Sequence, residues 1–195
     1  MKHAVIVAHP SQSSFNLCVA NAYCEAARQR GHAPILRDLY RMGFDPCLRD
    51  NEIPRPSGFK AGDDVLAERA IIAEAAVFAF IYPLWFNAPP AMIKGYIERV
   101  LGMGFGYGPV EGGGNTQLLK GRQLITFSSS GAPTEWVKED GAWSAIRNLF
   151  DDHVAGVCGL TFLDHVHFGG IVPGVRTDVV KEHLETVAKA VARFF

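Results

Sequence analysis

The stretch "AVFAFIYPLWFNAPP", residues 76–90, decides the fold of this chain. Its first half, residues 76–82, is an uninterrupted apolar run, which predicts a strand buried on both faces of a parallel sheet. Pro83 stops the strand, because proline has no N–H to donate to a neighbouring strand. Two large rings and an asparagine follow before two further prolines close the stretch. Such a stiff loop at the end of a core strand is either additional core packing or the wall of a ligand site.

Strand-like and helix-like segments alternate on both sides of this stretch. The expected strands are residues 3–8, 33–38, 76–82, 123–128 and 160–168, and the expected helices are residues 15–30, 63–74, 91–101, 143–153 and 177–195. Strands separated by helices form a parallel sheet with right-handed crossovers. Five of them predict an α/β fold, a flavodoxin-like doubly wound parallel sheet of order 2-1-3-4-5 with helices on both faces. We expect one domain, residues 1–195, with an irregular connection at 41–62 and a glycine-dense loop at 102–114 that exposes Phe105 and Tyr107.

Composition limits the classes of function. The chain has 195 residues, of which 48% are hydrophobic and 20% charged, as in globular proteins. A net charge of -1 gives no bulk attraction to nucleic acid. The four cysteines form no C-x-x-C pair, so we expect reduced thiols and no metal site. No segment approaches the roughly 20 apolar residues of a membrane helix, and the apolar start is too short for a signal peptide, so we expect a soluble cytoplasmic protein without membrane insertion.

Three loops leave the carboxyl ends of expected strands, the edge at which such sheets bind ligands. The first, "AHPSQSSFN" (residues 8–16), offers His9 and three serine hydroxyls at the start of a helix, where N–H groups favour an anion such as phosphate. It matches neither G-x-G-x-x-G nor a Walker A loop. Capping of the helix by Ser14 would explain this loop equally well.

The other two loops differ from the first in chemistry. "YPLWFNAPP" (residues 82–90) supplies a rigid apolar wall with one polar group, and "SSSGAP" (residues 128–133) supplies small residues that let a ligand approach the backbone. Core packing and an ordinary turn are the respective alternatives. Taken together, a phosphate site, an aromatic wall and a small-residue floor on one sheet edge fit a flavin. A dinucleotide or another phosphorylated ligand would satisfy much of the same pattern.

Three sequence blocks resemble a known family. "AHPSQSSFN", "YPLWFNAPPAMIKGYIERVLGMGFGY" and "LITFSSSGAP" look like the flavodoxin-like NAD(P)H:quinone oxidoreductases, the DT-diaphorase family and its shorter bacterial relatives. The matches run from residue 3 to about residue 133 and are weaker beyond. The middle block is the most specific, because its order of Pro-Leu-Trp-aromatic, Pro-Ala, Lys-Gly-aromatic and acidic-Arg-Val is hard to obtain by chance.

The resemblance implies a flavin, FAD or FMN, held by three groups of residues. These are His9, Ser13, Phe15 and Asn16 for the phosphate end, Leu84, Trp85, Phe86 and Asn87 for the isoalloxazine ring, and Ser128, Ser129, Ser130 and Gly131 for the ring and ribityl chain. Tyr107 falls where the family places an aromatic in the acceptor pocket. Larger members have Thr-Thr-Gly-Gly at positions 128–131, followed by a Tyr and a His. Here Trp136 falls near that Tyr, and residues 137–142 contain no His.

The implied activity is two-electron, ping-pong hydride transfer from NADH or NADPH through the flavin to a quinone-like acceptor. The flavin carries the chemistry, so no catalytic side chain is nominated. The family's shared acceptor pockets imply a homodimer, with Phe105, Tyr107, Trp136 and Trp143 as candidates for the shared wall. Two alternatives are an azoreductase and a cytoplasmic ancillary subunit of a potassium-efflux system that keeps oxidoreductase activity. A one-electron flavodoxin-type carrier is a further alternative, but such carriers are usually strongly acidic.

Overall fold

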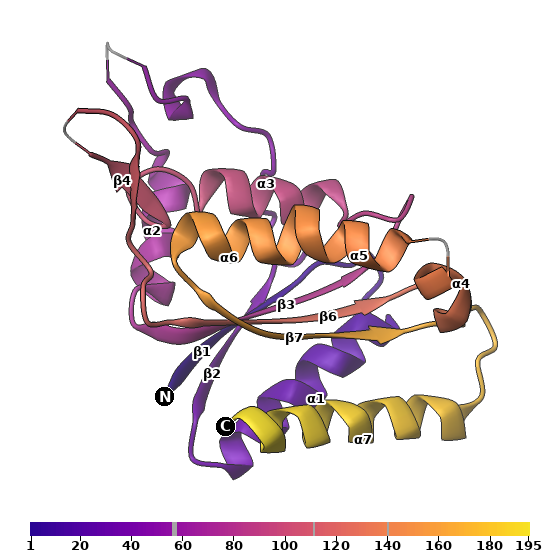
Figure 1. Ribbon diagram of the computed structural model, residues 1–195. Coiled ribbons are helices and arrows are strands. Elements are labelled where there is room, and N and C mark those ends of the chain that lie inside the picture. Colours follow the sequence, from indigo (N-terminus) through magenta and orange to yellow (C-terminus); the bar gives the residue numbers. More distant parts are fainter. Residues whose placement is uncertain (56–57, 111, 140) are drawn as a thin grey trace.

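The structure, a computed structural model, describes residues 1–55, 58–110, 112–139 and 141–195. Five parallel strands form its central sheet in the order β2-β1-β3-β6-β7 (Figure 1). They are β1 (Lys2–Val7), β2 (Ala33–Asp38), β3 (Ala75–Pro83), β6 (Gln123–Ser129) and β7 (Thr161–Phe168). In sequence order of these five strands this is 2-1-3-4-5, so the predicted flavodoxin-like arrangement is confirmed.

Helices cover both faces of this sheet (Figure 1). α1 (Phe15–Gln29) and α7 (Thr177–Phe194) lie on one face, and α2 (Asp63–Ile72), α3 (Ala91–Arg99) and α6 (His153–Cys158) lie on the other. Alternate residues of β1 serve the two cores: Val5 and Val7 pack on the α1–α7 side, and Ala4 and Ile6 pack on the α3 side. This division is the expected consequence of side chains alternating between the faces of a strand.

The helix expected at residues 143–153 is longer and less regular than the sequence indicates. It comprises α5 (Ala142–Ile146), a π-helical segment η2 (Arg147–Asp152) and then α6. A short helix, α4 (Thr134–Glu139), precedes it. Asp140, which separates α4 from α5 in the sequence, lies outside the described residues. Single π-helical turns are rare and concentrate at functional sites, so η2 marks a candidate functional segment.

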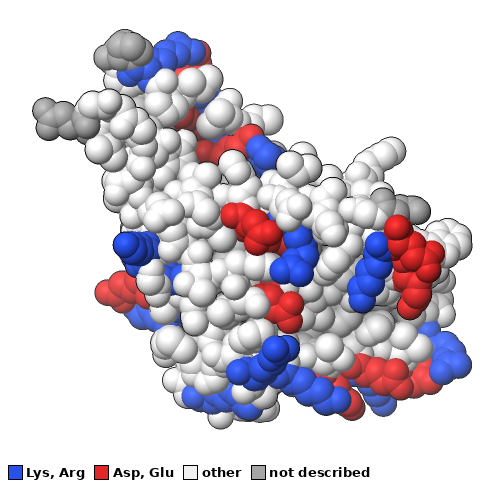
Figure 2. Space-filling model, in the orientation of Figure 1, with Lys and Arg blue, Asp and Glu red and all other residues white. Residues whose placement is uncertain are grey.

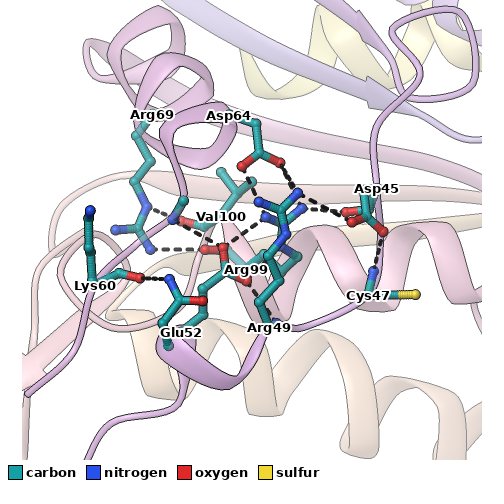
Figure 3. Close-up of polar contacts among 11 residues, drawn as sticks. Asp45, Cys47, Arg49, Glu52, Lys60, Asp64, Arg69, Arg99 and Val100 are labelled. Atoms are coloured by element: carbon teal, nitrogen blue, oxygen red, sulfur yellow. Dashed lines mark hydrogen bonds and ion pairs between the residues drawn. The ribbon is translucent and has the colours of Figure 1, made fainter.

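A buried ion-pair network holds the long connection at 41–62 in place (Figure 3). Arg99 at the end of α3 is 2% exposed and donates to both carboxylate oxygens of Glu52, each at 2.8 Å, from η1 (Asp50–Glu52). Its guanidinium also reaches Asp64 at 2.9 Å and the carbonyl of Asp45. The described part of the connection, which omits residues 56–57, is irregular as expected except for η1. It is nevertheless fixed to α3 by charge.

The expectation that the glycine-dense loop at 102–114 exposes its rings is wrong for the described part of that loop, which omits Glu111. Phe105 packs half-buried against the core, with the Arg69 guanidinium 5.8 Å from its ring. Tyr107 begins a short hairpin, β4 (Tyr107–Pro109) paired antiparallel with β5 (Asn115–Gln117). Gly106 makes this packing possible, since a Cβ there would lie 2.0 Å from the Leu101 carbonyl oxygen.

Charge is mixed on the molecular surface. On the face drawn in Figure 2, basic and acidic side chains are interspersed rather than gathered by sign, in keeping with the net charge of -1. Among the described residues, no helix combines the length and apolar character needed to cross a membrane.

Candidate functional site

A cleft of about 340 Å³ opens where the carboxyl ends of β1, β3 and β6 meet. The strands are in register there, with Val7 opposite Ile81 and Ile81 opposite Phe127. The loops that follow the three strands therefore emerge side by side, as predicted for ligand binding in such sheets. The cleft is lined by His9, Ser11, Ser14, Phe15, Asn16, Pro83, Leu84, Trp85, Ser129, Ser130, Gly131, Ile171, Val172 and Pro173.

The first wall of the cleft is the start of α1. Ser14 caps this helix, its hydroxyl accepting a hydrogen bond from the Leu17 N–H at 3.2 Å. Phe15 and Asn16, the first residues of the helix, line the cleft, and a helix leaves the N–H groups of its first turn without intrahelical partners. The capping alternative is therefore correct for Ser14. The same turn also faces the cleft with a helix N-terminus, where free N–H groups favour an anion.

His9 stands beside this helix end as a hydrogen-bond donor. Its Nδ1 accepts from the Ser11 N–H at 3.0 Å, so in the neutral ring the proton resides on Nε2. Burial and, to a lesser extent, the charge of Arg41 hold the pKa of His9 below its usual value, which favours the neutral ring at pH 7. Arg41 also braces the loop from behind by donating to the carbonyls of Pro10, at 2.7 Å, and of His9.

The second wall is a tight turn at residues 85–88. Trp85 and Ala88 exchange two backbone hydrogen bonds, at 3.1 and 3.2 Å, and Phe86 and Asn87 both have φ of 53°. Two successive left-handed residues define a type I′ turn, which is costly for a phenylalanine. Trp85 packs toward His9 with ring centroids 5.9 Å apart. Phe86 is fully exposed at 106%, so core packing does not explain this ring.

The floor of the cleft is the end of β6. The Leu84 N–H donates to the Ser129 carbonyl at 2.6 Å, which joins the second loop to the floor. The Ser129 hydroxyl donates to Oδ1 of Asn16 at 3.2 Å, which joins the floor to α1. Gly131 faces the opposite side of the cleft, since a Cβ at this residue would meet the Val172 side chain at 3.7 Å.

A fourth loop completes the cleft and was missed by the sequence analysis. Ile171, Val172 and Pro173 follow β7 and face the floor, and the Ile171 N–H donates to the Ser130 carbonyl at 2.9 Å. The signal was available: "GGIVPG" follows the fifth expected strand, whose carboxyl end lies at the same sheet edge.

The structure brings together eight of the predicted residues and leaves six outside the cleft lining. Those inside are His9, Phe15, Asn16, Leu84, Trp85, Ser129, Ser130 and Gly131. Ser13 is exposed beside the loop, and Phe86 and Asn87 form the tip of the turn. The Ser128 hydroxyl turns to the other face of β6, because neighbouring residues of a strand point in opposite directions. Tyr107 lines a separate groove beside α3, and Trp136 is 65% exposed on α4.

Comparison with known proteins agrees with this arrangement. Residues 1–191 match the model of a protein family described as having a flavodoxin-like fold. An uncharacterized NAD(P)H oxidoreductase of Haemophilus influenzae is 33% identical over 88% of this chain and 85% of its own length. NAD(P)H dehydrogenase [quinone] 1 of Rattus norvegicus is 29% identical over 94% of this chain and 76% of its own. The solved NAD(P)H:quinone oxidoreductase of Methanothermobacter marburgensis superposes with a TM-score of 0.84 at 30% identity, covering 98% of this chain and 95% of that one.

Proposed function

The chain belongs to the flavodoxin-like family that includes the NAD(P)H:quinone oxidoreductases, and on that premise we propose that it transfers hydride from NAD(P)H through a bound flavin to a quinone-like acceptor. The observation that carries this proposal is the cleft itself. One sheet edge joins an anion-binding helix start, an aromatic wall and a floor of small residues, which is the chemistry that a flavin mononucleotide unit requires.

The phosphate end of the flavin would lie against the start of α1. The unpaired N–H groups of Phe15 and Asn16 and the helix dipole favour an anion there. The Nε2–H of His9 adds a neutral donor on the same side. None of these groups needs to ionise to bind phosphate, so binding should persist across the neutral pH range.

The ring end would lie between the turn bearing Trp85 and the floor from Ser129 to Gly131. When bound, the flavin supplies the hydride acceptor and donor of the reaction. The protein supplies flat apolar area from Trp85 and hydroxyls from the floor, with Val172 closing the far side. Phe86 stands clear of the protein surface, where it would cover a nicotinamide or quinone entering the cleft.

NAD(P)H and the acceptor would use the open face of the bound flavin in turn, as the resemblance to the family implies. This order predicts ping-pong kinetics. The test begins with the cofactor: purified protein should absorb as a flavoprotein, and released cofactor should have the mass of FMN or FAD. Protein that takes up neither flavin contradicts the proposal.

His9→Ala gives a variant-level test of the same assignment. Loss of one phosphate donor should weaken flavin affinity by about 1–3 kcal/mol. The melting temperature of the apo-protein should change little, because the ring is a partly exposed surface group. If the variant lowers the melting temperature of the apo-protein but keeps the wild-type flavin affinity, His9 has a structural role and does not bind phosphate.

We further propose a homodimer built on the groove beside α3. This groove, of about 450 Å³, runs between α3 and the η2–α6 segment and is lined mainly by apolar side chains, including Ile97, Leu101, Val154 and Tyr107. Leu149 at its edge is 79% exposed. An apolar groove of this kind is an expected contact for a second copy in a two-fold assembly.

Light scattering on a sizing column tests the assembly. Wild-type protein should elute as a dimer, and Leu149→Asp should shift it toward monomer by placing a charge in the groove. A wild-type monomer with full activity contradicts the shared interface. The four free thiols agree with a reducing compartment, and we propose the cytoplasm as the location.

A further inference from the structure

A continuous chain of hydrogen bonds runs from the cleft floor into the core beneath η2. Ser130 lines the cleft, and its hydroxyl lies 3.0 Å from Nε2 of His167. Nδ1 of the same ring lies 2.9 Å from the Ser128 hydroxyl, which lies 2.7 Å from Nε2 of His165. Nδ1 of His165 lies 2.6 Å from Asp151 in η2. Every link is within ordinary hydrogen-bond distance.

One end of the chain fixes the direction of its bonds. The Ser130 hydroxyl donates to the Ala132 carbonyl at 2.9 Å, so it must accept from Nε2–H of His167. Nδ1 of His167 then accepts from Ser128, and Ser128 accepts from Nε2–H of His165. Burial keeps His167 neutral, as this arrangement requires, by lowering its pKa to about 4.

At the inner end, one proton is left between two acceptors. Nδ1 of His165 faces Oδ2 of Asp151, while Oδ1 of Asp151 accepts from the Thr126 hydroxyl at 2.7 Å. The contact is satisfied only if this pair holds a proton between its two atoms. The pair is therefore a store of one proton, connected by hydrogen bonds to the cleft floor.

A contribution to stability does not by itself explain the buried His165–Asp151 pair. Asp151 and the His165 side chain are fully buried, and buried ion pairs can often be replaced by apolar side chains without loss of stability. The pair also sits at the π-helical segment, a feature that concentrates at functional sites. Trp143 of α5 packs against both histidine rings, at centroid distances of 4.6 Å from His165 and 5.6 Å from His167.

The same atoms also resemble a Ser-His-Asp hydrolytic triad, but their placement argues against it. The triad serine would be Ser128, which is 1% exposed and does not line the cleft. A nucleophile must reach its substrate within hydrogen-bonding or shorter distance. Only Ser130, at the outer end of the chain, can touch a bound molecule.

We propose that Ser130, His167, Ser128, His165 and Asp151 form a proton relay that supplies the cleft during acceptor reduction. This inference rests on the proposed function. A quinone that becomes a hydroquinone gains one hydride, which originates in NAD(P)H and carries both electrons, and one proton. The relay supplies that proton, and NAD(P)⁺ is the oxidised product.

The transfer balances bond by bond. Ser130 gives its O–H proton to the acceptor oxygen and receives the Nε2 proton of His167. His167 receives the proton of Ser128, and Ser128 receives the Nε2 proton of His165. Each link then points the opposite way, and the inner pair is left with one proton fewer. Water reloads the chain through Ser130 after the product leaves the cleft.

The charged and titratable groups around the relay come from four elements. They are His165 and His167 on β7, Asp151 on η2, Tyr82 on β3 and Lys138 on α4. Lys138 and His165 both disfavour a charged His167, so this ring passes protons without keeping one. The Tyr82 hydroxyl is buried and has no hydrogen-bond partner among the described residues.

The first test separates the two half-reactions by rapid mixing, with a soluble benzoquinone as acceptor. Ser130→Ala should slow flavin reduction by NAD(P)H much less than quinone reduction, with both rates measured at saturating flavin because Ser130 lines the cleft. It should slow quinone reduction by about 100-fold, which is the lower end of the rate loss expected when a positioned proton donor is removed. Small buffer acids should partly restore the rate, and the solvent isotope effect should change. Ser130→Thr, which keeps the hydroxyl, should restore the wild-type rate of quinone reduction and the wild-type solvent isotope effect.

His3→Gln is the control for a general loss of stability, since it removes a buried hydrogen-bonding side chain outside the relay. His3 is 0% exposed and hydrogen-bonded to Tyr23 at 2.8 Å, but it lies at the amino end of β1, away from the cleft. This variant should lower stability without changing the pH profile or the isotope effect. Unchanged quinone reduction in Ser130→Ala overturns the relay alone, and wild-type protein that reduces no quinone overturns the proposed function and the relay with it.

A second readout needs no flavin. Nitrogen-15 NMR of the apo-protein should show His167 as the Nε2–H tautomer and a strongly deshielded proton on the His165–Asp151 contact. Both signals should move in Ser128→Ala, which cuts the chain at its middle. A His167 ring protonated on Nδ1 overturns the bond directions from which the relay is inferred.

Discussion

The Ser129 hydroxyl donates to Oδ1 of Asn16 at 3.2 Å, a contact between residues 113 positions apart in the sequence. It joins the end of β6 to the first turn of α1 directly beneath the cleft. Both side chains are at most 3% exposed. The contact therefore fixes the end of β6 relative to the start of α1, the two walls that we propose for the flavin ring and its phosphate. Removing it should affect stability and flavin binding together.

Ser129→Ala leaves a buried Asn16 oxygen without its donor, and we expect it to lower the free energy of unfolding by about 1–3 kcal/mol. A double-mutant cycle with Asn16→Ala should give a coupling energy of about 0.5–1.5 kcal/mol. Urea denaturation measures both. Ser13→Ala is the control, since this exposed hydroxyl should change stability by no more than about 0.5 kcal/mol. Additive single mutants would show that the two walls are independent.

Phe86→Ala distinguishes a ligand wall from core packing. The ring is fully exposed, so the apo-protein should keep its stability to within about 0.5 kcal/mol. Flavin affinity or the rate of hydride transfer should fall, because the open face of the cleft loses its cover. The control is Phe80→Ala, which removes a ring that is 0% exposed and should cost about 3–5 kcal/mol. Paired melts of apo and holo forms decide the matter: an equal loss in both would contradict the assignment.

The sequence predicts the sheet well because one physical rule dominates it. Apolar runs such as residues 76–82 have no stable place except a buried strand, and alternation with helices then fixes a parallel order. The same rule places three loops at one edge and finds most of the cleft. It does not say which way a side chain points where the strand ends.

The three consecutive serines after Phe127 show this limit. Ser128 faces His165, Ser129 faces Asn16, and Ser130 borders the cleft. A one-residue change of register would exchange the roles of the first two, and identical side chains carry no signal of register. The sequence also contains no indication of the role of Asp151. Its partner, His165, lies 14 positions later on β7, and Asp151 itself lies in the π-helical segment η2, which the sequence pattern does not predict.

Gly131→Leu should block the cleft without straining the backbone. Gly131 does not have a left-handed φ, and a Cβ would meet Val172 at an ordinary 3.7 Å, so the chain should fold. A longer side chain would occupy space that a ring needs, and flavin affinity should fall at least tenfold. Gly156→Ala is the matched control: it lies in α6 with open space around it and should stabilise the protein by about 0.5–1 kcal/mol with unchanged flavin binding. Isothermal titration of apo-protein with FMN measures the difference.

Glu52 should make the protein sensitive to acid, because its two hydrogen bonds from Arg99 lower its pKa to about 2. A carboxyl group with a lowered pKa stabilises the fold fully above its unfolded value of about 4.5, and that contribution disappears as the pH falls toward 2. Figure 3 shows why the loss matters: Arg99 anchors the connection at 41–62 to α3. Stability should therefore decline between pH 4.5 and pH 2.

Glu52→Gln identifies the residue responsible. At pH 7 the variant leaves a buried guanidinium without its main partner and should lose about 3–5 kcal/mol. The difference from wild type should shrink as the pH falls from 4.5 toward 2, because the unfolded wild-type chain then binds a proton at Glu52 that the folded protein binds only near pH 2. Glu74→Gln is the control, since its pair with Lys2 is exposed and should contribute at most about 1 kcal/mol. Urea titrations at several pH values measure both, and a pH-independent gap between Glu52→Gln and wild type would show that the carboxylate charge is not what holds the connection.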